Sequence, residues 1–146
     1  MFLNELNKEE ARAFLGLVTK LANIDDVFAK EERKLVNEYI EELNLSDKQD
    51  EILEYDEVVS ILRNTTTRKK SIIYFELVGL ALVDGEYGDK EIDFLDKIAY
   101  DLDIPRYKKI AFANYFVNFK EIYNFSVVEY ENKIELLKEQ AEALLN

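Results

Sequence analysis

Leu80-Ala81-Leu82-Val83-Asp84-Gly85-Glu86-Tyr87 is a second copy of Leu21-Ala22-Asn23-Ile24-Asp25-Asp26-Val27-Phe28, displaced by 59 residues (84 − 25 = 59). The same displacement places Glu32 on Glu91, Leu43 on Leu102 and Leu45 on Ile104. In each copy an Asp ends one apolar run, and a Glu seven residues later opens the next. A repeat that keeps its apolar positions while its surface positions drift indicates a duplicated structural unit.

Around these two loops the apolar residues follow a helical period. The sequence predicts an all-α fold: a single domain over residues 1–146 with seven to eight helices. Two pseudo-symmetric helical repeats cover about 14–62 and 73–120, and a long C-terminal helix follows over about 125–145. Four Gly and one Pro are too few for an all-β chain, which needs these residues in its turns.

Several helix boundaries can be predicted from single residues. Asn7 and Glu10 form the pattern of a capping box, so the first helix begins after Asn7. The polar run over residues 64–67 separates the two halves, and Pro105 marks the first position of a later helix. The stretch over residues 72–83 is the most apolar of the chain, which predicts a central helix buried on most sides.

The composition excludes whole classes of chemistry. The 146 residues contain no Cys and no His, which removes thiol nucleophiles, imidazole bases and the ligands that zinc, copper and iron prefer. A bound metal would therefore be a hard cation held by oxygen, such as Ca²⁺ or Mg²⁺. The net charge of −12 repels nucleic acid. No signal-peptide pattern and no long apolar run are present, so we expect a cytoplasmic protein without membrane insertion.

The two acidic loops allow two interpretations. The eight residues from 84 to 91 contain four acids, Asp84, Glu86, Asp89 and Glu91, together with Gly85 and Gly88. Three of these carboxylates could converge on a cation. In the first copy Asp25 and Glu32 occupy the equivalent positions, but Asp26 replaces the Gly. The other interpretation is structural: each Asp forms an Asx turn, and each Glu caps the helix that follows. Both interpretations stay open at this level.

One helix ends in Ala81-x-x-Asp84-Gly85-Glu86, and Glu91, Phe94, Leu95 and a closing Leu-Asp-Ile follow it. This pattern resembles the tellurite-resistance TerB-like family. The chain is also similar to the N-terminal domain of DjlA-type membrane co-chaperones. A weaker form of the pattern is carried by Ala22, Asp25, Phe28, Glu32 and Leu35. The resemblance covers roughly residues 14–117.

The resemblance implies a duplicated all-helical fold and a cytoplasmic stress-response role without catalysis and without a required cofactor. It also implies divalent-cation binding, by Ca²⁺ or Mg²⁺, at the acidic loops. The site residues would be Asp84, Glu86, Asp89, Glu91, Asp25 and Glu32. Protein partners, some of them at the cytoplasmic face of the membrane, are implied as well, while no residue points to tellurite itself.

Two alternatives remain from the residues alone. The chain could be a purely structural protein–protein adaptor in which the acids only cap helices, or a hydrolase that uses Asp84 and Glu91 as paired carboxylates. No phosphate-binding loop and no Ser–His pair support catalysis. The aromatic helix over residues 107–119 is expected to pack into the core, with a partner groove as the alternative. Tyr100, Tyr123 and Tyr130 are expected to be semi-exposed, where they could anchor an interface.

Overall fold

In the computed structural model, which describes residues 2–24, 41, 53–83, 88–125 and 130–145, the chain is helical and these residues include no strand. A short 3-10 helix, η1 (Leu3–Glu5), precedes six described α-helices. These are α1 (Lys8–Ala22), α3 (Tyr55–Arg63), α4 (Thr67–Val83), α5 (Asp89–Asp101), α6 (Arg106–Phe125) and α7 (Tyr130–Leu145). The all-α prediction is therefore confirmed. Much of the first predicted repeat, residues 25–40 and 42–52, lies outside the described residues.

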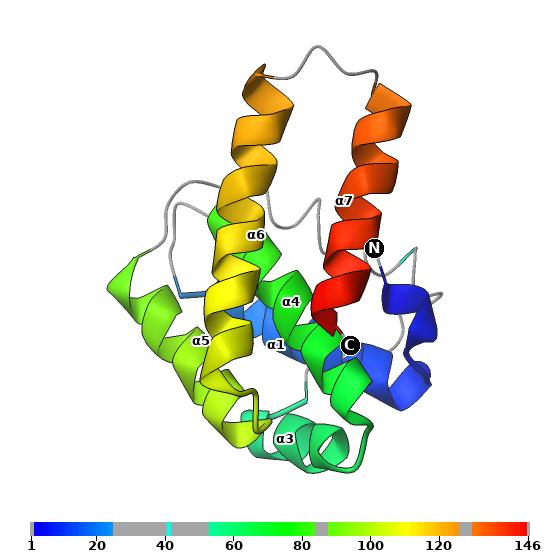
Figure 1. The fold of residues 1–146 in the computed structure, drawn as a ribbon. Helices are drawn as coiled ribbons and strands as arrows, with labels where there is room; N and C mark the ends of the chain where they lie inside the picture. The colour runs from blue at the N-terminus through cyan, green and yellow to red at the C-terminus, as the bar shows by residue number, and fades with distance from the viewer. Residues whose placement is uncertain (1, 25–40, 42–52, 84–87, 126–129, 146) are drawn as a thin grey trace.

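The helix α4 lies at the centre of the fold (Figure 1). It contacts η1, α1, α5, α6 and α7. Residues 71–75 and 77–81 are all buried, so α4 is covered on most of its circumference. A helix that is apolar on all sides needs neighbours on all sides, which is the arrangement predicted for residues 72–83.

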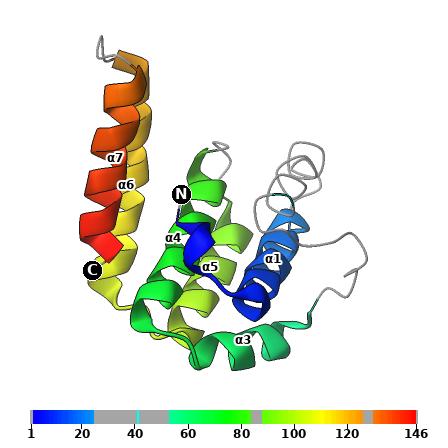
Figure 2. The same cartoon turned by 90° about the vertical axis from the view of Figure 1, so that its right-hand side faces the viewer.

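The other helices surround α4. In Figure 2, α6 and α7 lie on one side of α4 and α1 on the other, with α5 beside α4 and α3 across the bottom of the view. α6 and α7 are antiparallel and in contact, and α1 packs on α3. α6 continues to Phe125, beyond the predicted end near residue 119, because the sequence from Arg106 to Phe125 contains neither Gly nor Pro.

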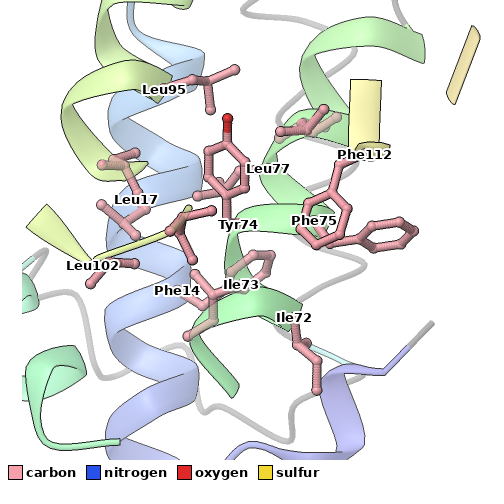
Figure 3. Packing of buried hydrophobic residues seen from close by; sticks show 14 of the residues in the cluster. Phe14, Leu17, Ile72, Ile73, Tyr74, Phe75, Leu77, Leu95, Leu102 and Phe112 are labelled. Atoms are coloured by element: carbon pink, nitrogen blue, oxygen red, sulfur yellow. The ribbon is translucent and has the colours of Figure 1, made fainter. Parts of the chain in front are cut away.

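The core is a single cluster of buried side chains from all of these elements. Figure 3 shows α4 side chains between Phe14 and Leu17 on one side and Phe112 on the other. Phe75 is the aromatic centre, with ring centroids at 5.3 Å from Phe112, 5.2 Å from Tyr115 and 4.8 Å from Phe116. Burial of this apolar surface is the main force that holds the helices together.

The ends of the helices confirm several local predictions. At α1, the Asn7 side chain accepts from the Glu10 amide at 2.9 Å, and the Glu10 carboxylate accepts from the Asn7 amide at 2.9 Å. At α4, the Thr66 hydroxyl accepts from the Lys69 amide at 3.2 Å. α6 begins at Arg106, so Pro105 lies one residue before the position predicted for it.

α5 ends in a tight turn that explains the Leu102-Asp103-Ile104 motif. The Ile104 amide donates to the Ala99 carbonyl at 2.8 Å, and the Asp103 amide donates to the Tyr100 carbonyl at 3.3 Å. This pair of bonds is a Schellman motif, which needs a left-handed residue after the helix. Asp103 supplies it with φ of 57°. Leu102 and Ile104 are buried on either side, so the motif closes the helix and anchors the turn in the core.

Candidate functional site

The structure describes two of the six predicted metal ligands, both in the first turn of α5. Gly88 is the N-cap, Asp89 is exposed, and Glu91 is the third residue of the helix and only 4% exposed. Asp84, Glu86, Asp25 and Glu32 lie outside the described residues. Within the described part of the chain, no three acidic side chains come together as a metal-binding group.

Glu10 shows what a buried glutamate does at the third position of another helix in this chain. It is also 4% exposed, and its carboxylate accepts hydrogen bonds from the Asn7 amide, the Thr65 hydroxyl and the Lys69 ammonium. Burial alone would raise the pKa of Glu10, but these hydrogen bonds and the Lys69 charge outweigh it and lower that pKa. A glutamate buried at this position can therefore use its carboxylate to hold neighbouring segments together through hydrogen bonds.

A second polar feature joins α3 to the end of α5. The Tyr55 hydroxyl donates to Asp101 at 2.5 Å, and the Lys97 ammonium lies 4.3 Å from the centre of the Tyr55 ring. Burial, and then the Asp101 carboxylate, raise the pKa of Tyr55. Two open depressions flank this contact, and Arg63 and Asp101 line both. Both hollows are open to the surface and more polar than apolar.

A lysine buried between α4 and α6 was not anticipated from the sequence. Lys108 is 5% exposed, and its ammonium donates to the Ser71 hydroxyl at 2.8 Å. A Ser–Lys pair can act as nucleophile and base in some hydrolases. Ser71 is fully buried on the central helix, so no substrate carbonyl can reach its oxygen. The contact is a polar link between two helices.

The surface of α6 carries the most unusual exposed side chains. Tyr107 is 68% exposed, Ile110 52% and Val117 51%. With Arg106, Asn114 and Asn118, which are also exposed, they form what we call the α6 face. The prediction that Tyr107 packs into the core is wrong, whereas Phe112 and Tyr115 are buried as predicted. Tyr100, expected to be semi-exposed, is 84% exposed.

The exposed positions on α6 follow one side of the helix. Tyr107, Ile110, Asn114 and Val117 are spaced three, four and three residues apart, which keeps them on one face. Phe112 and Tyr115 lie on the opposite face, against α4. This spacing was visible in the sequence, but apolar residues on both sides of α6 hide which side is exposed.

Comparisons with protein-family models, with curated proteins and with solved structures found no match. None of the described helices combines the length and hydropathy needed to cross a bilayer.

Proposed function

We propose that this chain is a non-catalytic helical interaction module, similar in kind to TerB-like proteins, that binds a protein partner through the α6 face. The exposure of Tyr107, Ile110 and Val117 on one side of α6 is the observation that supports this function. Single exposed apolar side chains are ordinary, but three on one helical face form the centre expected of a docking surface. A partner that docks on this exposed helical face needs no cleft.

The proposed role predicts that the α6 face is dispensable for folding. The double variant Ile110→Asn, Val117→Asn should melt within about 3 °C of the wild-type protein, because both side chains are half exposed. The matched variant Leu95→Asn alters a buried apolar residue on α5 and should lower the melting temperature strongly. If the α6 double variant instead unfolds as the Leu95 variant does, the face serves the core and the proposed function is wrong.

A duplicated architecture belongs to the same proposal. The first residue of α1, Lys8, and that of α4, Thr67, are 59 residues apart (67 − 8 = 59), the displacement of the sequence repeat. Asn44 lies 59 residues before Asp103. Apart from Gly, Asn and Asp are the residues that most readily adopt the left-handed conformation. These offsets support two repeats, over about 14–62 and 73–120, in which Leu-Asx-Leu/Ile closes a helix.

Cation binding at the loop between α4 and α5 is the second candidate function. Burial of Glu91 beside a loop that carries Asp84 and Glu86 favours it, since a carboxylate withdrawn from water gains from a cation. The rival interpretation is the structural adaptor, in which Glu91 only caps α5. Glu10, at the same position of α1, is buried and hydrogen-bonded to the Asn7 amide and the Lys69 ammonium, which favours the capping role.

A thermal titration distinguishes cation binding from the capping role. An ion that binds only the folded state raises the melting temperature. If the loop binds Ca²⁺ or Mg²⁺, millimolar ion should stabilise the wild-type protein, and Asp84→Asn should remove the effect. Asp93→Asn, at an exposed position one turn into α5, is the matched control and should keep the full effect. Unchanged melting at 10 mM of each ion, about tenfold above the weakest biological dissociation constants of roughly 1 mM, would leave only the capping role.

A further inference from the structure

The α6 face lacks the acidic residues found on the exposed face of α5. The exposed residues of α5 are Asp89, Lys90, Asp93, Asp96, Lys97 and Tyr100, of which five are charged. On α6, the exposed residues from 106 to 118 include one charged side chain, the cation Arg106, and no carboxylate. In a chain of net charge −12, a second acidic molecule therefore meets less repulsion at this face than at the exposed face of α5.

The same face is complementary to itself when two α6 helices run antiparallel. A twofold axis between Ala113 and Asn114 pairs residues whose numbers sum to 227 (113 + 114 = 227), so Ile110 of one copy lies opposite Val117 of the other (110 + 117 = 227). The symmetry forms this Ile110–Val117 contact twice. Ala113, at the axis, is small enough to let two helices approach to the usual 8–10 Å or so.

We infer that the α6 face binds the α6 face of a second copy of this chain, with the two helices antiparallel about an axis at Ala113 and Asn114. The dimer rests on the proposed role of the α6 face and names the partner. An interface of about three helical turns lies at the low end of specific interfaces, near 1,000 Å² in total. Self-association should therefore be weak, with a dissociation constant on the order of 0.1 mM.

Salt should strengthen this dimer. The pairing is apolar, while two copies of net charge −12 repel each other over the distance that salt screens. Sedimentation velocity from about 5 µM to 1 mM should show a monomer–dimer equilibrium that is tighter in 0.5 M than in 0.02 M NaCl, because the Debye length falls from about 20 Å to about 4 Å. A partner held by ion pairs would show the reverse dependence.

Substitutions locate the interface. Ile110→Glu should lower the association constant at least tenfold, because it places two carboxylates in an apolar contact that occurs twice. Tyr100→Glu is the matched control, since it exchanges an exposed apolar residue for the same charge on α5 and should leave association unchanged. A monomer at 1 mM in 0.5 M NaCl, or a dimer indifferent to Ile110→Glu, would overturn the inference.

Cross-linking tests the register. The chain has no cysteine, so Asn114→Cys introduces its one thiol close to the axis, where the two Cα atoms fall within disulfide range. Asn118→Cys makes the same exchange on the same face, but the two residues would lie about 13 Å apart along the helices and should not cross-link. Equal cross-linking of both variants would overturn the antiparallel arrangement.

The dimer and the proposed function fail in different ways. A protein that stays monomeric while Ile110→Asn, Val117→Asn melts normally would remove the second copy as the partner and keep the α6 face as a surface dispensable for folding. A double variant that unfolds would remove the proposed function, whatever the oligomeric state.

Discussion

Gly79 is the position at which the smallest change should disturb the contact between α4 and α6. A methyl group built on Gly79 would lie 2.5 Å from Cζ of Phe116 and 2.7 Å from its Cε1. Carbon atoms in contact prefer about 3.5–4.0 Å, so the ring or the helix must move by about 1 Å. The Phe116 ring already packs at 4.8 Å from Phe75 and 5.0 Å from Tyr115, which limits where it can go.

The magnitude for Gly79→Ala follows from two opposing effects. Replacing Gly by Ala inside a helix stabilises it by about 1 kcal/mol. Overpacking a filled interface costs about 1–3 kcal/mol. We expect the second effect to win and the free energy of unfolding to fall by about 1–2 kcal/mol, equivalent to a melting temperature roughly 3–6 °C lower. Urea unfolding followed by circular dichroism measures this directly.

Two further variants make the Gly79 measurement decisive. Gly16→Ala adds the same methyl in α1, where the nearest atom, Cγ2 of Val58, is 3.3 Å away, so its cost should be at least about 1 kcal/mol smaller. Adding Phe116→Leu to Gly79→Ala should recover part of the lost stability, which a double-mutant cycle reports as coupling. A Gly79→Ala protein more stable than wild type would show that α4 and α6 do not approach as described.

Three other outcomes are expected. Asp103→Gly should stabilise the protein by about 1 kcal/mol in urea unfolding, because Gly adopts the left-handed conformation without the cost that Asp bears; a loss of stability would contradict the Schellman turn. Lys108→Met with Ser71→Ala should raise the melting temperature at pH 7 by a few degrees, since it removes a buried charge and its hydroxyl partner together; a strong loss would show that the charge itself is needed. Burial, and then the Glu76 charge, raise the pKa of Tyr115 to about 12, and the pKa of Tyr55 is raised as well. The folded state therefore keeps tyrosine protons that the unfolded state loses near pH 10, so the free energy of unfolding should fall as the pH rises from 10 to 12. In pH-dependent melting curves, Tyr55→Phe should reduce this fall.

Local signals were enough to predict much of the fold. The capping box at Asn7 and Glu10, the break over residues 64–67 and the apolar stretch of α4 all depend on neighbours within a few positions. Such features can be derived from sequence because the partner of each group is set by the helical repeat.

Features that depend on which helix lies opposite could not be derived. α6 has apolar residues on both sides, so its sequence does not tell whether Phe112 or Ile110 faces α4. In the sequence, Lys108 resembles an ordinary surface lysine in the first turn of a helix. Its contact with Ser71 depends on the packing of α4 against α6. Among the predicted metal ligands, the position of Glu91 in α5 was predicted, whereas its burial depends on packing that spacing alone does not specify.

The most direct test of the account is a concentration series of ¹H–¹⁵N correlation spectra of the uniformly labelled protein. If the α6 face is the interaction surface, raising the concentration from about 20 µM to 1 mM should shift the amide signals of Tyr107, Ile110, Asn114 and Val117. Signals of the exposed residues of α5, such as Asp93 and Tyr100, should stay in place. Shifts confined to α5, or no shifts anywhere, would contradict the assignment of α6 as the surface through which this protein acts.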